Sequence, residues 1–160
     1  MPRILVVEDE QMLAKIIGMK LESEGYVVEH AYDGQAAYDA LCIEPQPDLT
    51  LLDVLLPRMS GFDVLEKLQA DGKPLPKVIV FSNFAQKADV ERAHALGAID
   101  YIVKAAFSPA EIISKVKSVL AEAAAAPIQA PQAAYQQFSS MEDVMPMSEV
   151  LRPGESNNNP

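Results

Sequence analysis

The stretch from Pro47 to Gly61, PDLTLLDVLLPRMSG, contains an apolar run, LTLLDV at 49–54, that is interrupted by one carboxylate. A short apolar run bounded by turn residues is typical of a strand buried in a sheet. Burying a carboxylate without a partner is costly, so the chain must gain something from Asp53. We therefore take Asp53 as the first candidate functional residue.

Other short apolar runs alternate with helical patterns along the chain. They are ILVV at 4–7, YVVEHA at 26–31, KVIVFS at 77–82 and IDYIV at 99–103. This alternation is typical of βαβ units and predicts an α/β fold with a five-stranded parallel sheet. The first, third and fourth runs are apolar at odd and even positions alike, as in strands covered on both faces. We therefore expect helices on both faces of the sheet.

The helical patterns carry their own start and stop signals. The first, about 10–24, is predicted to turn one face inward and to stop at Gly25; that face holds Leu13, Ile16, Ile17 and Leu21. Another helix is predicted from Gly34 and a weaker one over about 86–96. Two more are predicted by capping boxes, which are Ser60 with Asp63 and Ser108 with Glu111.

Length and composition predict one domain, residues 1–125, followed by a tail. The net charge of -10 and the lack of clustered Lys and Arg argue against direct binding of nucleic acid. No apolar run is long enough to insert into a membrane, and the N-terminus turns acidic too early for a signal peptide, so we expect a cytoplasmic protein. The single cysteine, Cys42, is expected to pack against a helix.

The composition changes near Ala126 to Ala, Pro, Gln, Ser and Asn. Such a composition is typical of a flexible segment, so residues 126–160 are predicted to form a low-complexity tail. One alternative stays open, in which part of the tail docks as a short amphipathic element. Its apolar residues would be Tyr135, Phe138, Met141, Val144 and Met147.

The polar residues that can do chemistry follow the predicted strands. Ligands bind at the carboxyl ends of parallel strands, and in a sheet of order 2-1-3-4-5 the first and third strands are neighbours. Glu8 and Asp9 would then lie beside Asp53. Three carboxylates this close repel one another unless a cation joins them. Mg²⁺ fits best, because it binds through one or two carboxylates and bridges to phosphate oxygens.

Asp53 is the single acid at the end of the third predicted strand, whereas Glu8 and Asp9 both follow the first. A carboxylate can act as a nucleophile and form an aspartyl-phosphate. Phosphoryl transfer then needs positive charge around the phosphoryl oxygens, which Lys104 and the metal ion would supply. Ser82 offers a hydroxyl to a third oxygen.

Over about residues 2–122 the chain resembles the receiver domain of two-component response regulators, in particular single-domain, chemotaxis-regulator-like ones. The resemblance rests on the order and spacing of Glu8, Asp9, Asp53, the DVLLPRMSG loop, Ser82, Tyr101 and Lys104. It implies a flavodoxin-like, doubly wound sheet and Asp53 as phosphoacceptor, with Ser82 and Tyr101 as the switch pair. It assigns the metal site to Glu8, Asp9, Asp53 and the backbone carbonyl of Leu55.

The resemblance also implies partners. A histidine kinase or histidine phosphotransfer protein would donate the phosphoryl group, and an unidentified downstream protein would read the signal. The receiver would be a monomer or a phosphorylation-dependent dimer. Met12, Lys15 and Met19 face away from the predicted core face of the first helix, and in the family this helix meets the histidine-bearing partner.

One departure and several alternatives remain. The family lysine usually precedes a proline in a cis bond, whereas Lys104 precedes Ala105, where a cis bond would cost roughly 3 kcal/mol. Taken alone, Glu8 and Asp9 could simply cap the first helix. A haloacid-dehalogenase-type phosphohydrolase would need a second acid where the chain has Leu55. A flavodoxin-like cofactor binder would need a phosphate loop after the first strand, and a phosphorylation-incompetent scaffold receiver is the third rival.

Overall fold

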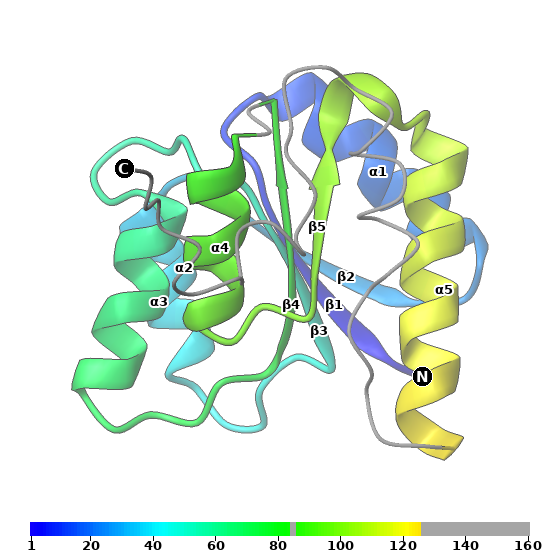
Figure 1. Ribbon diagram of the computed structural model, residues 1–160. Helices are drawn as coiled ribbons and strands as arrows, with labels where there is room; N and C mark the ends of the chain where they lie inside the picture. Colours follow the sequence, from blue (N-terminus) through cyan, green and yellow to red (C-terminus); the bar gives the residue numbers. More distant parts are fainter. Residues whose placement is uncertain (84–85, 126–160) are drawn as a thin grey trace.

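The computed structural model describes residues 1–83 and 86–125, which form a five-stranded parallel sheet flanked by helices (Figure 1). The strands are β1 (Arg3–Val7), β2 (Val27–Ala31), β3 (Leu49–Leu52), β4 (Lys77–Ser82) and β5 (Asp100–Val103). The helices are α1 (Gln11–Ser23), α2 (Gly34–Leu41), α3 (Gly61–Ala70), α4 (Lys87–Ala95), the 3₁₀ turn η1 (Lys104–Ala106) and α5 (Pro109–Ala125).

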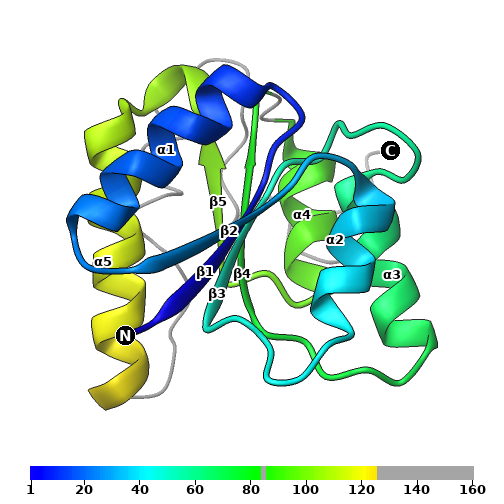
Figure 2. The ribbon, with the colours of Figure 1, turned by 180° about the vertical axis from the view of Figure 1, so that it is seen from behind.

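The strand order is β2-β1-β3-β4-β5, which confirms the predicted flavodoxin-like topology. α1 and α5 cover one face of the sheet, and α2, α3 and α4 cover the other; the view from behind shows the same layers (Figure 2). β3 is buried along its whole length, while β1 and β4 are buried except at their first residues. Apart from those first residues, covering both faces removes the side chains of these strands from water, as their apolar sequences predicted.

The buried face of α1 differs in part from its prediction. Ile17 and Leu21 are buried as expected, but Ile16 is 41% exposed, and the other buried positions belong to Ala14 and Gly18. A side-chain carbon at Gly18 would lie only 2.8 Å from the ring of His30. α1 therefore approaches β2 along a stripe of small residues, and Ile16 is turned outward.

Both predicted capping boxes are present. Ser60 accepts a hydrogen bond from the Asp63 N–H, and Asp63 accepts one from the Ser60 N–H, which fixes the start of α3. Ser108 and Glu111 make the same reciprocal pair at the start of α5. Each box satisfies N–H groups that the first turn of a helix leaves without partners.

Two glycines let the loop between β3 and α3 pack closely. A side-chain carbon at Gly61 would lie 2.2 Å from the carbonyl oxygen of Asp53, and one at Gly34 would lie 1.9 Å from that of Met59. The Gly61 N–H also donates to the Val54 carbonyl at 2.8 Å. The start of α3 is thereby held against the backbone of Asp53.

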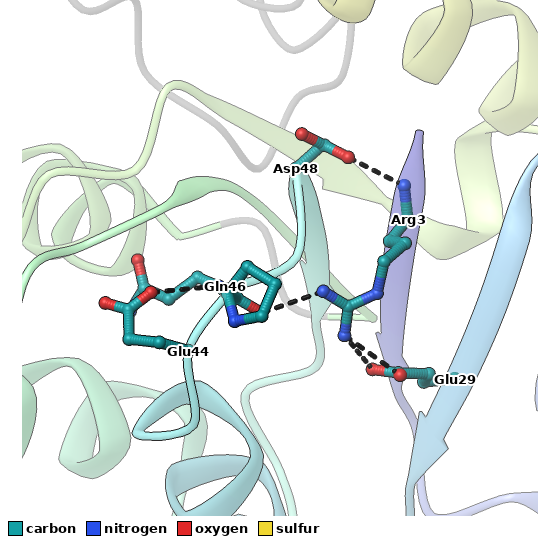
Figure 3. Close-up of polar contacts among 6 residues, drawn as sticks. Arg3, Glu29, Glu44, Gln46 and Asp48 are labelled. Atoms are coloured by element: carbon teal, nitrogen blue, oxygen red, sulfur yellow. Dashed lines mark hydrogen bonds and ion pairs between the residues drawn. The ribbon is translucent and has the colours of Figure 1, made fainter. Parts of the chain in front are cut away.

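At the amino ends of the strands, Arg3 joins neighbouring segments of the sheet (Figure 3). Its guanidinium donates to Glu29 of β2 at 3.0 and 3.1 Å and to the Pro45 carbonyl at 2.7 Å. Its backbone N–H donates to Asp48 at 2.7 Å. These bonds join β1 to β2 and to the segment that leads into β3, far along the strands from Asp53.

Among the described residues, no helix is both long enough and apolar enough to cross a bilayer.

Thr50 supplies a stability test for the sheet. It is fully buried in β3, and its hydroxyl has no hydrogen-bond partner among the described residues. Since an unsatisfied buried hydroxyl is destabilising, Thr50→Val should raise the free energy of unfolding by about 1 kcal/mol. Urea denaturation measures this change. Thr50→Ser, which keeps the hydroxyl and loses a methyl group, should be less stable than the parent; a Val variant no more stable than the parent would contradict the assignment.

Candidate functional site

The predicted site residues meet at the carboxyl edge of the sheet. Glu8 follows the last residue of β1, Asp53 follows the last residue of β3, and Ser82 ends β4. Lys104 follows the last residue of β5 and opens η1. Parallel strands end on the same edge, so the strand order brings these four side chains together from distant parts of the chain.

Lys104 is the charged centre of the cluster. Its ammonium nitrogen lies 2.5 Å from a carboxylate oxygen of Glu8 and 2.9 Å from one of Asp53. It also lies 4.8 Å from the centre of the Phe81 ring, close enough for a cation–π contact. Only 13% of the Lys104 side chain is exposed, so both ion pairs are largely withdrawn from water.

The remaining oxygens of the two buried acids face backbone donors. Glu8 accepts from the Glu10 N–H at 3.0 Å, and Asp53 accepts from the Leu55 N–H at 3.3 Å. Each carboxylate thus binds the lysine with one oxygen and a backbone N–H with the other. The carboxylates are therefore held in fixed orientations. Neither acid caps α1, because Glu10 is the N-cap residue of that helix and no side chain makes a capping hydrogen bond there.

Burial shifts the acid–base equilibria of these groups. Desolvation raises the pKa of Glu8 and of Asp53 above their ordinary values, although the hydrogen bonds with Lys104 oppose the shift. Desolvation alone would lower the pKa of Lys104, but its hydrogen bonds with Glu8 and Asp53 outweigh that effect and raise it. The lysine stays charged, and the two acids are destabilised as carboxylates compared with acids in water.

Glu8, Asp9 and Asp53 form a set that could hold a metal ion. One oxygen from each residue lies within 4.8 Å of the others. Glu8 and Asp53 are buried, whereas Asp9 is exposed, so the set opens to solvent on one side. Hard oxygen ligands with an open side suit Mg²⁺, which keeps several of its waters. The residues present therefore fit the predicted ion.

Ser82 and Tyr101 are both buried beside this edge. Burial raises the pKa of the Tyr101 phenol, the charge of Asp89 adds to the shift, and a hydrogen bond with Ser82 opposes it. The two residues predicted as a switch pair are thus in contact through their side chains.

The connection after β5 settles a question that the sequence left open. The only cis peptide within residues 1–83 and 86–125 joins Glu44 to Pro45, so the bond from Lys104 to Ala105 is trans. The chain then forms η1, and the N–H of Phe107, the residue after this turn, donates to the Lys104 carbonyl at 3.4 Å. Lys104 still reaches both acids, although no proline follows it.

The remaining predicted residues, on the β3–α3 loop and on α1, are exposed to solvent. Leu55 is 57% exposed and offers no acid two residues after Asp53, as the sequence showed. Met12 and Met19 are exposed on α1, as is Lys15. Ile16 joins them on the same side of the helix, and sequence reasoning missed it because it was assigned to the core face.

Comparison with known proteins gives a consistent result. The response regulator receiver domain family matches residues 4–117. The DNA-binding dual master transcriptional regulator RpaA of Synechocystis is 34% identical over 121 residues, which cover 75% of this chain and 49% of that protein. The probable transcriptional regulatory protein TcrX of Mycobacterium tuberculosis is 37% identical, with coverages of 73% and 49%. The chain spans about half the length of these relatives.

Solved structures agree in fold. A CheY-like response regulator receiver domain protein from Methanospirillum hungatei has a TM-score of 0.69 and 31% identity, covering 76% of this chain and 95% of that one. The response regulator TrrA from Thermotoga maritima, solved in complex with Mg²⁺ and BeF, has a TM-score of 0.63 and 30% identity, with coverages of 74% and 99%. The fold, the acidic edge and the family match agree, and the chain therefore belongs to the response regulator receiver domains of two-component systems.

Proposed function

We propose that this receiver accepts a phosphoryl group on Asp53 from a phosphohistidine of a kinase or phosphotransfer protein. One observation carries the proposal: Asp53 contacts the Lys104 ammonium and forms a set of possible metal ligands with Glu8 and Asp9 at the carboxyl edge of the sheet. A nucleophilic carboxylate, a fixed cation and a set of metal ligands are the groups that phosphoryl transfer onto aspartate requires.

In the transfer, an Asp53 oxygen forms a bond to phosphorus as the bond from phosphorus to the histidine nitrogen breaks. The imidazole leaves with the electron pair of that bond and takes up a proton. Lys104, which holds Asp53 at 2.9 Å, is placed to neutralise charge on the phosphoryl oxygens. Burial raises the pKa of Asp53, which makes its carboxylate a stronger base and a better nucleophile towards phosphorus.

Glu8, Asp9, Asp53 and the backbone carbonyl of Leu55 would hold Mg²⁺, and the ion would supply positive charge to the phosphoryl group. The complex of TrrA with Mg²⁺ and BeF supports this part of the proposal. Lys104 occupies one oxygen each of Glu8 and Asp53, so these acids must share their lone pairs between the lysine and the ion.

The signal would then pass through Ser82 and Tyr101 to the surface formed by α4, β5 and α5. Their hydrogen bond is the observation that supports this route. We propose that a downstream protein reads this surface in the cytoplasm, with the receiver as a monomer or a phosphorylation-dependent dimer. The DNA-binding activity in the name of RpaA belongs to that longer protein.

The first prediction concerns the phosphoacceptor. Incubation with acetyl phosphate and Mg²⁺ should add the mass of one phosphoryl group, and Asp53→Asn or chelation of divalent ions should abolish the adduct. Intact-mass spectrometry measures both. Asp48→Asn is the matched control, because Asp48 lies at the opposite end of β3 and should leave the adduct unchanged. An adduct that survives in Asp53→Asn would refute the assignment.

The second prediction concerns Lys104. Lys104→Met leaves two buried carboxylates without their shared cation, so it should lower the free energy of unfolding by about 3 kcal/mol without metal. Mg²⁺ should then stabilise the variant more than it stabilises the parent, because the ion takes over the role of the lysine. Thermal unfolding with and without Mg²⁺ measures this difference. Lys73→Met, at an exposed lysine, should behave as the parent; equal gains from Mg²⁺ in all three proteins would contradict the prediction.

The third prediction concerns the exposed side of α1. Met12→Gln with Met19→Gln should slow transfer from the cognate histidine donor, because both side chains are exposed and suited to apolar contact. Phosphorylation by acetyl phosphate should stay unchanged, since neither residue touches the site. Measuring both rates separates docking from chemistry, and equal losses in the two assays would indicate damage to the fold instead.

A further inference from the structure

A groove of about 330 Å³ lies between α1 and α5, outside the phosphoryl-transfer site. Lys20 and Ser23 of α1 line it together with Ile113, Ser114 and Lys117 of α5. Ile113 is buried, while the other four side chains are exposed. The groove therefore has an apolar floor and a rim of hydroxyl and ammonium groups, together with the carboxylate of Glu24.

The groove continues into the exposed apolar residues of α1. Met12, Ile16, Met19 and Ser23 follow one another at spacings of three or four, so they lie on one side of the helix. Ser23 belongs to both the groove and this row. We call the row of Met12, Ile16 and Met19 together with the groove the α1–α5 surface.

This surface is locally basic in an acidic protein. The charged residues that line the groove are Lys20, Lys117 and Glu24, a net charge of +1, whereas the whole chain carries -10. Lys117 is paired with Glu24 at 2.5 Å, but Lys20 makes no ion pair within the described part of the chain. A partner for this surface should therefore combine apolar side chains with a small number of carboxylates.

The chain itself carries a segment with this chemistry. Residues 135–147, YQQFSSMEDVMPM, place apolar side chains at every third position and include the acidic pair Glu142 and Asp143. The segment follows α5, whose last residue is Ala125, after a connection of nine residues, 126–134. Ile113 lies twelve residues before Ala125, about 18 Å along the helix. Nine residues extended span about 30 Å, so the segment can reach the groove.

We propose that residues 135–147 dock on the α1–α5 surface of the same molecule. Their apolar side chains would cover Ile113 and the methionine row, and Glu142 or Asp143 would pair with Lys20. The docking does not depend on the proposed function.

Zero-length carbodiimide cross-linking of the full chain tests the docking directly. It joins a lysine amine to a carboxylate in contact with it, and peptide mass spectrometry identifies the pair. We expect Lys20 joined to Glu142 or Asp143, at a yield that does not depend on protein concentration. Lys73 and Lys87 are exposed away from the groove and serve as internal controls.

Variants in the segment separate docking from chance contact. Phe138→Ser with Met141→Ser should reduce the Lys20 product to the level of the Lys73 and Lys87 products. Met145→Ser, which lies off the three-residue spacing, should leave it unchanged. Equal products at all three lysines would overturn the proposal, and so would a yield that rises with concentration, because the groove would then hold a second copy. The readout needs no phosphorylation, so it stands or falls separately from the role of Asp53.

Discussion

The ion pairs of Lys104 with Glu8 and Asp53 join the ends of β5, β1 and β3, and the arrangement of the site depends on them. Without the lysine, two carboxylates would be buried side by side, each already disfavoured by desolvation. A buried ion pair of this kind gives little net stability, because the desolvation penalty offsets most of the attraction. The apolar layers on both faces of the sheet must therefore supply the free energy that keeps the charged cluster assembled.

A parallel sheet covered on both faces, with its polar residues at one edge, could be predicted from simple periodic patterns, whereas the strand order came from the family resemblance. Strands that are apolar at odd and even positions alike require both faces of the sheet to be covered. Parallel strands also bring their polar carboxyl ends to one edge of the sheet. On this ground Asp53, Glu8 and Lys104 could be assigned to the same edge of the sheet. The capping boxes at Ser60 and Ser108 were predictable for a similar reason, since they are local patterns of side chain and backbone.

Features that depend on close packing between elements could not be predicted in this way. Ile16 was assigned to the core because helical spacing does not reveal that Ala14 and Gly18 permit a closer approach to β2. The ion pair of Asp100 with Lys115, at 3.0 Å, joins β5 to α5. No pattern in the sequence near either residue predicts that the two side chains meet. The contact of Lys104 with Glu8 was missed as well, because the length of the β5–α5 connection does not fix where the lysine ammonium lies.

The contacts of Gly34 and Gly61 have a consequence for how this receiver can diverge. The loop that follows Asp53 is held by two close backbone contacts, Gly61 against Asp53 and Gly34 against Met59. At either glycine, one added side-chain carbon would collide with a carbonyl oxygen. The exposed loop residues between these ends, such as Leu55, can vary without moving Asp53. The rate of the proposed phosphoryl transfer and the choice of partner can therefore change through exposed residues, while the position of Asp53 is fixed by two glycines that admit no side chain.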